Sequence, residues 1–444
     1  MIAPARSLTP SPRQTRPITT LHLTNAYHEQ SGGIRTLYHA LLDAAEERGR
    51  RMVLVVPSER DGEERWGHTT TIVHVRAPRS PAVDGRYRLI LPHRFLPEDR
   101  GPLWALLDRL RPDVLEVCDK YSLCYFAGLI RRRRRRGIQG PGLVGLSCER
   151  MDDNLEVHLG GRGVSRAAAK AFLGHAYIGM FDVHLANSEY TADELREAMR
   201  PSHERPVHVC RMGVDQRKPP GAYRQFAIRR RLLARCGRRD ARLVIYAGRL
   251  SPEKHVMRLP ETIAATSQWE AERPVHLLVV GDGPQRARLE AECSRVIPDR
   301  AHFLGHVADR DELAGIISAC DAFLHVNHRE PFGIGPLEAM GLGTPVVMPA
   351  SGGVLSYGSD DNAWLADAGA RGLVDALRAC LLNESERHRR AMNGRTTAQR
   401  HAWSQVTPEI FRVYDSVSQR RHEYPCAVPP PVPTTAITNF AEHS

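Results

Sequence analysis

Short apolar segments alternate with amphipathic segments along the first half of the chain. The predicted strands are Ile18–Thr24, Met52–Pro57, Val114–Val117, Gly142–Ser147 and Asp182–Ala186. A helix is predicted from Ile34 to about Arg48, and Thr191 with Glu194 has capping-box spacing, which predicts a second helix opening there. Buried strands that alternate with helices predict a parallel sheet covered on both faces.

The same alternation begins again near residue 241. The predicted strands are Leu243–Ala247, His276–Val280, His302–Leu304, Ala322–Val326 and Pro345–Met348, and the predicted helices are roughly 255–271, 284–295, 309–319, 335–341 and Pro408–Gln419. The sequence therefore predicts an α/β protein with two Rossmann-like, doubly wound domains that face a cleft.

Composition changes set the expected boundaries. Residues 216–240 are polar and Arg-rich and contain two adjacent prolines, so the interdomain linker is predicted there. The first domain is then 18–215, the second 241–405, and a closing helix spans 406–422. Residues 1–17 are expected to be a disordered leader, without the apolar core of a secretory signal, and residues 423–444 a disordered tail.

Size and cysteine content narrow the class of protein. A chain of 444 residues is long enough for two or three domains, and no apolar run approaches the roughly 18–20 residues that cross a bilayer. The nine cysteines form no C-x-x-C pair and their number is odd. A disulfide framework or a zinc site is therefore not expected, and a cytoplasmic location fits better.

The net charge of +11 favours anionic partners. Six consecutive arginines, Arg131–Arg136, are the strongest local feature. Such a run is usually a solvated surface, but it also fits an anionic membrane surface such as the inner face of the plasma membrane. A third possible partner of the arginine run is nucleic acid. The sequence contains no nucleic-acid recognition module, so no nucleic-acid partner is expected.

The segment Arg329–Gly343, REPFGIGPLEAMGLG, carries the most chemical information. Gly335 followed by Pro336 predicts a helix that starts with proline at its first position. Glu330 then lies in the preceding loop. Glu338 lies in the first turn, where a carboxylate suits the positive end of the helix dipole.

The backbone amides at this helix start are a candidate phosphate site, since they lack intrahelical acceptors. They belong to Phe332, Gly333, Ile334 and Gly335. Glu338 is the candidate acceptor for ribose hydroxyls, and Glu330 for those of a transferred sugar. The alternative is a helix whose first turn is charged but binds no ligand. The length of the segment Arg329–Gly343 disfavours this alternative.

Further candidates follow the ends of other predicted strands, where doubly wound folds bind ligands. Arg249 and Lys254 follow Leu243–Ala247 and could neutralise a departing diphosphate; Lys254 is one of only four lysines. Gly32 and Gly33 follow the first strand and would let a phosphate or sugar approach the backbone. Gly281 and Gly283 are read as a structural turn.

A second set of candidates lies in the first domain. The candidate positions for contact with a second substrate, the acceptor, are Asp119, Lys120 and Tyr121 after one predicted strand and Glu149 and Arg150 after the next. We call these the acceptor-side candidates. A structural partner for a nearby arginine is an equally good interpretation of Glu149. Asp152 and Asp153 are read as a surface loop rather than a metal site.

These motifs together resemble the retaining glycosyltransferases of family 4, which have the GT-B fold. Glu330 and Glu338 match the E-x7-E motif of that family, Gly248–Lys254 its G-R-x-x-x-x-K segment, and Ser31-Gly32-Gly33 its glycine loop. Ala186–Tyr190 and Met212–Asp215 match stretches before the linker. Glu149-Arg150 stands near a position where many members have a histidine.

The resemblance implies a donor sugar linked to GDP or UDP, transfer of a hexosyl group of mannose or glucose type with retention, and no cofactor or catalytic metal. Arg249, Lys254 and Glu330 would be the catalytic residues. The acceptor would be a sugar or a glycolipid. A GT-B sugar-nucleotide epimerase, a phosphorylase and a non-catalytic protein bound to membrane or nucleic acid are the alternatives.

Overall fold

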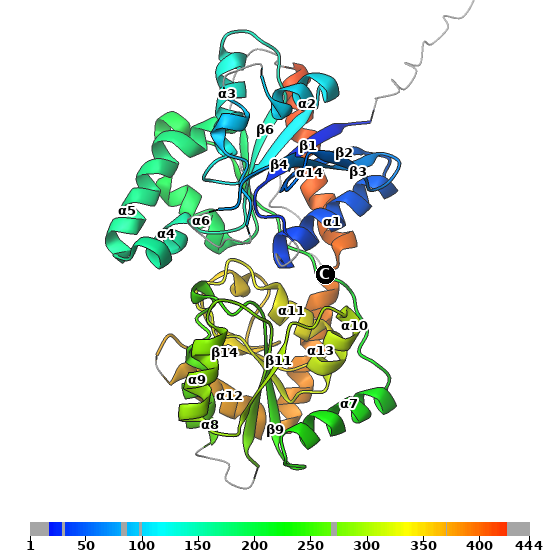
Figure 1. Cartoon of the computed structure of the whole chain (residues 1–444), viewed down its shortest axis with the longest axis vertical. Helices are drawn as coiled ribbons and strands as arrows, with labels where there is room; N and C mark the ends of the chain where they lie inside the picture. The colour runs from blue at the N-terminus through cyan, green and yellow to red at the C-terminus, as the bar shows by residue number, and fades with distance from the viewer. Residues whose placement is uncertain are drawn as a thin grey trace, which may run out of the picture.

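The computed structural model describes residues 17–28, 32–80, 87–96, 100–267, 273–369 and 371–423. The leader and tail that the sequence predicts as disordered, 1–17 and 423–444, lie almost wholly outside these ranges, and so does Ser31 of the glycine loop. Two α/β domains are stacked one on the other along the long axis of the molecule (Figure 1).

The first domain is built on an eight-stranded sheet with the order β3-β4-β2-β1-β5-β6-β7-β8, in which β3 is the antiparallel member. Its strands are β1 (Thr19–Thr24), β2 (Arg51–Ser58), β3 (Gly62–Arg65), β4 (Thr70–Arg76), β5 (Val114–Cys118), β6 (Gly142–Ser147), β7 (Val183–Ala186) and β8 (Val207–Val209). Every residue of β1, β5 and β6 is buried, as expected of parallel strands covered on both faces.

Helices cover both faces of this sheet. They are α1 (Gly32–Glu47), α2 (Pro102–Leu110), α3 (Cys124–Arg135), α4 (Met151–Leu159), α5 (Arg162–Phe172) and α6 (Glu189–Ala198), with short turns η1 (Pro92–Arg94), η2 (Leu173–Tyr177), η3 (Ile178–Met180) and η4 (Pro201–His203). Leu37 and Leu41 of α1 belong to one core cluster, whereas Leu103 of α2 and Phe126 of α3 belong to the other.

Helix α6 begins earlier than predicted. Its N-cap is Ser188, whose hydroxyl accepts the backbone N–H of Thr191 at 3.2 Å, while the Ser188 N–H donates to the Thr191 hydroxyl at 3.2 Å. Thr191 is therefore the third helical residue of a capping box, and the prediction that it opens the helix is wrong. Thr191 and Glu194 have the spacing of a capping box, but the residue that caps the helix is Ser188, three positions before Thr191.

The second domain has a six-stranded, fully parallel sheet with the order β11-β10-β9-β12-β13-β14. Its strands are β9 (Arg242–Ala247), β10 (Val275–Val280), β11 (Ala301–Gly305), β12 (Ala322–Leu324), β13 (Val346–Pro349) and β14 (Trp364–Ala366). Its helical segments are α7 (Ala222–Arg235), η5 (Pro252–Lys254), α8 (Arg258–Ser267), α9 (Arg286–Val296), α10 (Arg310–Ser318), α11 (Ile334–Gly341), η6 (Gly353–Ser356), α12 (Gly372–Leu382) and α13 (Glu384–Arg400).

Helix α7 lies within the range that the sequence predicts as linker. Arg229 fixes it to the second domain by an ion pair with Asp321 at 2.9 Å and a hydrogen bond to the Ala319 carbonyl at 2.7 Å. Among its residues only Leu232 is buried. A helix with so narrow an apolar stripe gives almost no periodic signal, which explains its linker-like sequence.

The last helix, α14 (Trp403–Glu423), returns to the first domain, where it is drawn in red beside β1 (Figure 1). Its buried residues, among them Ile410 and Val417, pack in the core cluster that also contains α1. The Tyr414 hydroxyl donates to the fully buried carboxylate of Glu116 on β5, which also accepts from Tyr38 at 2.8 Å. The closing helix is thus longer than the predicted Pro408–Gln419 and includes Pro408 in its interior.

Candidate active site

Loops at the carboxyl ends of the two sheets meet between the domains. A Cβ atom added to Gly33 of α1 would lie 3.5 Å from the Ile334 side chain of α11. The Ser188 hydroxyl donates to the Pro331 carbonyl at 2.6 Å, and Arg329 pairs with Glu156 of α4 at 2.9 Å. Because ligands of doubly wound domains bind at this edge, the meeting point is the candidate active site.

The helix that carries the glutamate motif starts one residue before Gly335. Gly333 precedes it with a left-handed φ of 88°, and a Cβ there would lie 2.8 Å from Val354 and 2.9 Å from Tyr357. Glycine is therefore required at this turn. The Tyr357 hydroxyl donates to the Gly333 carbonyl at 2.6 Å, which fixes the orientation of this peptide.

Two positions within this helix differ from the prediction. Helix α11 starts at Ile334, so Pro336 is its third residue rather than its first, and Glu338 is its fifth and lies in the second turn. The expectation of a first-turn carboxylate is wrong. Proline is tolerated here because the early N–H groups of a helix lack intrahelical acceptors. Glu338 lies 3.7 Å from Arg310, and burial raises the pKa of Glu338.

Glu330 is the most strongly held group of the site. The residue is 7% exposed, and its carboxylate accepts hydrogen bonds from the Lys254 ammonium at 2.8 and 2.9 Å and from the Asn327 side chain at 3.0 Å. Burial alone would raise the pKa of Glu330, but Lys254, His325 and Asn327 outweigh it and hold the pKa at about 2. Glu330 is thus fully ionised at neutral pH.

His325 completes the surroundings of this carboxylate. Its Nε2 atom lies 3.5 Å from the Glu330 carboxylate, and burial lowers the pKa of His325 to about 4, so the ring is neutral at pH 7. Sequence reasoning missed both His325 and Asn327. Their position at the end of β12, three to five residues before Glu330, was the available signal.

The turn that holds Lys254 is shaped by a neighbouring loop. Gly281, with φ of 131°, lies so close to Gly248 that a Cβ would approach its carbonyl oxygen to 1.9 Å. Leu250 N–H donates to the Asp282 carbonyl at 3.0 Å. The structural turn that the sequence predicts at Gly281 and Gly283 thus packs under the segment carrying Arg249 and Lys254.

Arg249 points to the other domain. Its guanidinium lies 5.4 Å from the ring centroid of Tyr87, which belongs to the first domain. Sequence reasoning missed Tyr87, because an aromatic residue in a loop has no distinctive spacing. The predicted pair of cations is therefore divided: Lys254 contacts Glu330, and Arg249 lies against the opposite wall.

The glycine motif of the first domain forms the start of a helix. Gly32 and Gly33 are the first residues of α1, whereas the sequence predicted a helix from Ile34. Because Gly33 faces Ile334, the N-termini of α1 and α11 approach each other across the site. Two positive helix ends together favour an anionic group such as a diphosphate between them.

Three of the proposed acceptor-side residues are engaged inside the first domain. Asp119 accepts the N–H groups of residues 121–123 at 2.6–3.0 Å. Lys120, 1% exposed, donates to Glu194 at 2.6 Å, and Arg150 pairs with Asp152 at 2.7 Å. These contacts favour structural roles. The prediction that Asp152 and Asp153 belong to a surface loop is wrong: both lie in the first turn of α4, and Asp153 accepts from the Tyr190 hydroxyl.

The other two acceptor-side candidates converge on one amide. Asn154 donates to the Tyr121 hydroxyl at 3.0 Å and to the Glu149 carboxylate at 2.9 Å. Burial raises the pKa of Glu149. Asn154 was missed from sequence because it comes from α4, whereas Tyr121 and Glu149 follow β5 and β6. Of the five acceptor-side candidates, Tyr121 and Glu149 are thus held together by Asn154.

Comparisons with known proteins identify the family in both halves of the chain. A family described as "Glycosyltransferase Family 4" matches residues 31–218, and one described as "Glycosyl transferases group 1" matches residues 236–397. These two matches cover the first and the second domain in turn.

Named relatives agree with these matches. A GDP-mannose-dependent alpha-(1-6)-phosphatidylinositol dimannoside mannosyltransferase of Mycobacterium tuberculosis is 29% identical over 88% of this chain and 94% of its own. A GDP-mannose-dependent alpha-mannosyltransferase of the same species is 27% identical over 90% and 97%. Among solved structures, sucrose-phosphate synthase of Thermosynechococcus elongatus superposes with a TM-score of 0.70 at 18% identity, over 91% of this chain and all of that one.

The fold and the interdomain site define a GT-B enzyme that transfers a sugar from a nucleotide sugar to an acceptor. Within that class, the chain belongs to glycosyltransferase family 4.

Proposed function

We propose that this enzyme transfers a mannosyl group from GDP-mannose, with retention of configuration, to a hydroxyl group of a phosphatidylinositol-linked glycolipid. The observation that carries the proposal is the Lys254–Glu330–Asn327 cluster beside the N-terminus of α11. The donor and acceptor are proposed by analogy with two relatives whose names give GDP-mannose, one of which acts on a phosphatidylinositol dimannoside.

Glu330 would orient the donor sugar. An ionised carboxylate is purely a hydrogen-bond acceptor, so it suits sugar hydroxyls, which donate. With a pKa of about 2, it is too weak a base to deprotonate an acceptor hydroxyl near neutral pH. This property supports a positioning role.

Lys254 would contact both Glu330, which orients the donor sugar, and the diphosphate of the donor. An ammonium has three N–H donors, and two of them point to Glu330, which leaves capacity for a phosphate oxygen. Together with Arg249 and the amides of residues 332–335, it would stabilise the leaving diphosphate, where negative charge grows during transfer. The acceptor hydroxyl would attack the anomeric carbon from the face that the nucleotide leaves. A phosphate oxygen would take the proton, and no protein nucleophile is required.

Donor choice is tested first by thermal stabilisation with GDP, UDP, GDP-mannose and UDP-glucose. We expect a shift of Tm with GDP and GDP-mannose that is at least several times larger than with the uridine ligands, because only the matching base is bound. Transfer is then followed with a phosphatidylinositol mannoside as acceptor, with and without EDTA. Stabilisation by uridine ligands alone, or formation of an epimer without an acceptor, would refute this donor and reaction.

We further propose that the first domain binds an anionic membrane surface through α3. No helix among the described residues is long and apolar enough to span a bilayer. In the arginine run, Arg131 and Arg134 both pair with Asp182, and Arg133 lies over the Trp104 ring. The run is thus not uniformly solvated, and its exposed members are Arg132, Arg135 and Arg136.

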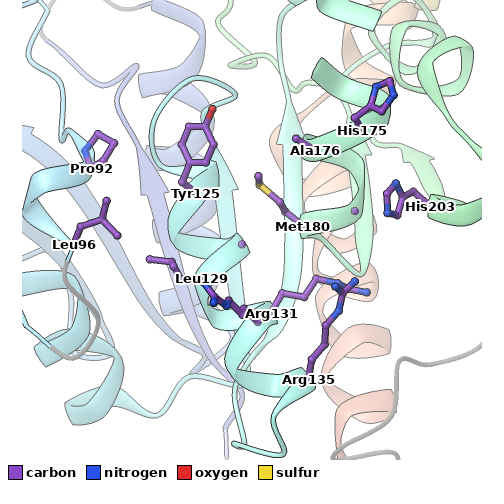
Figure 2. Close-up of a pocket in the computed structure, with 13 residues that line it drawn as sticks. Pro92, Leu96, Tyr125, Leu129, Arg131, Arg135, His175, Ala176, Met180 and His203 are labelled. Carbon is purple, nitrogen blue, oxygen red and sulfur yellow. The ribbon is translucent and has the colours of Figure 1, made fainter. Parts of the chain in front are cut away.

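A cavity of about 750 Å³ lies beside these arginines. Figure 2 shows Tyr125 and Leu129 of α3 between Leu96 on one side and Met180 on the other. Leu96 is 48% exposed and Tyr125 40% exposed. Apolar side chains next to basic ones on one helix suit the boundary between acyl chains and anionic head groups.

Removal of the exposed charges should weaken membrane binding. We expect the triple variant Arg132→Gln/Arg135→Gln/Arg136→Gln to bind vesicles of phosphatidylcholine and phosphatidylinositol roughly 100-fold more weakly, since each basic residue near the surface contributes about 1 kcal/mol. Sedimentation with vesicles measures it. The matched control removes exposed arginines of the second domain, Arg288, Arg295 and Arg371. Equal losses in both variants would show that only net charge matters.

A further inference from the structure

A cluster of metal-ligating side chains lies in the second domain, outside the candidate active site. It joins Cys236 at the C-terminal cap of α7, His276 in β10 and His302 in β11. One ligand atom from each residue lies within 4.8 Å of the other two, and His276 Nδ1 is 2.9 Å from His302 Nε2. Cys236 and His276 are buried, at 8% and 3% exposure.

We propose that Cys236, His276 and His302 bind a soft divalent metal ion, best matched by Zn²⁺. One thiolate and two imidazoles are ligands that zinc prefers, with bonds of about 2.0–2.3 Å in a tetrahedron. Such bonds place ligand atoms roughly 3.3–3.8 Å apart. The two imidazole nitrogens therefore have to separate by a few tenths of an ångström, and a water molecule takes the fourth position.

The two imidazoles are in the form that binds a metal ion, whereas the Cys236 thiol has to lose its proton. Burial lowers the pKa of His276 to about 4 and also lowers that of His302, so both rings are neutral at pH 7 and can ligate. Burial raises the pKa of the Cys236 thiol to about 11, and the neighbouring Arg235 opposes that rise. Binding of zinc would replace the thiol proton, which is released to solvent.

The ligands and charges of the cluster disfavour hard cations. Arg235, Arg238 and Arg300 act on the two histidines, as do the carboxylates of Asp240 and Asp299. A site with this cationic excess and without a carboxylate ligand disfavours Ca²⁺ and Mg²⁺, which need several oxygen ligands. A soft ion held by thiolate and imidazole depends less on the net charge of the surroundings.

The position of the cluster indicates a structural role. His276 and His302 are each the second residue of a parallel strand, so they lie at the amino edge of the sheet, opposite the candidate active site. Cys236 ends the first helix after the interdomain connection. The Arg235 side chain also donates to the Phe303 carbonyl of β11 at 3.3 Å. A metal ion would fasten α7 to the edge of the second sheet.

Zinc content of the tag-free full-length chain tests the proposal, because a histidine tag would bind zinc itself. After dialysis against excess ZnCl₂ and then buffer, we expect about one zinc per chain in the natural protein and in Cys293→Ser, a buried cysteine of α9. Cys236→Ser and His276→Asn should retain less than about a tenth as much. Zinc should raise Tm by about 5 °C in the natural chain and in Cys293→Ser but not in Cys236→Ser or His276→Asn, with the initial transfer rate of the natural chain unchanged.

A spectroscopic readout keeps the test valid if a variant fails to fold. Co²⁺ added to the natural chain should give intense visible bands of tetrahedral cobalt and a thiolate-to-cobalt charge-transfer band in the near ultraviolet. Zinc should bleach both. Weak octahedral bands without charge transfer, or equal zinc content in the natural chain and both variants, would overturn the proposal and leave a simple hydrogen-bonded histidine pair.

Discussion

Loss of either partner of the Lys254–Glu330 pair is expected to lower the rate of sugar transfer by at least about 100-fold, the usual scale for loss of one transition-state contact. Glu330→Gln keeps the shape but removes the charge that holds Lys254 at 2.8 Å. Lys254→Ala removes the cation beside the leaving diphosphate. The measurement is kcat for transfer from GDP-mannose under saturating donor.

Two controls separate this effect from general damage. Lys218→Ala removes the same charge at an exposed position in the segment between the domains and should leave kcat within about twofold of the natural enzyme. Thermal unfolding of each variant reports whether the fold survives. If Glu330→Gln and Lys254→Ala both transfer mannose at near-normal rates with intact folds, the proposed site is wrong.

Replacement of Lys120 is expected to destabilise the protein rather than to alter acceptor binding. Lys120 is 1% exposed, and its ammonium donates to Glu194 at 2.6 Å and to the Glu149 carbonyl at 2.5 Å. Lys120→Met leaves the Glu194 carboxylate buried without its cation. Breaking a buried pair in this way costs about 3–5 kcal/mol. We expect Tm to fall by roughly 6–20 °C.

A double-mutant cycle identifies the cause of this loss. Lys120→Met/Glu194→Gln removes both charges, so it should recover part of the lost stability, because no unpaired charge is left. Lys170→Met, at an exposed position of α5, should leave Tm unchanged within a degree or two. A Lys120→Met variant of normal stability that had lost only acceptor affinity would restore Lys120 to the acceptor site.

Contacts between the two domains lie on both sides of Glu330 in the candidate site. Arg329, the residue before Glu330, pairs with Glu156 at 2.9 Å and lies 3.5 Å from Asp153. The Ser188 hydroxyl holds the Pro331 carbonyl on the other side of Glu330. First-domain groups therefore hold both neighbours of the key carboxylate. We therefore expect any movement of the two domains relative to each other to be coupled to the position of Glu330 through this segment.

Strands with continuous apolar sequence were predicted to within one or two residues. Gly142–Ser147 agrees with β6, and Leu243–Ala247 differs from β9 by one residue. The three-residue strands β8 and β14 were missed, because so few positions cannot establish a period, whereas β12, also of three residues, lies within the longer predicted apolar run Ala322–Val326. The strand β4 was also missed, although its Thr70–Arg76 sequence is rich in β-branched residues.

Several helices gave weak signals for identifiable reasons. Helix α3 ends in five consecutive arginines, of which Arg131 is 5% exposed because Asp182 neutralises it. Pro408 predicted the start of the last helix, but α14 begins at Trp403, since its apolar face packs on the first domain and compensates for one missing N–H. Tertiary contacts overrode local preference in both cases.

The sequence by itself determined the alternation of strands and helices, the doubly wound class, the family resemblance and the order of the donor-side motifs. These properties are local: apolar period, turn residues and short motifs are readable from neighbours along the chain. Only the tertiary structure decided which charged side chain meets which, because partners 74 residues apart, as in the pair of Lys120 with Glu194, leave no joint pattern in one sequence. Only the tertiary structure shows that Lys254 and Arg249 lie apart, that Lys120 is buried, and that Cys236 lies beside two histidines from different strands.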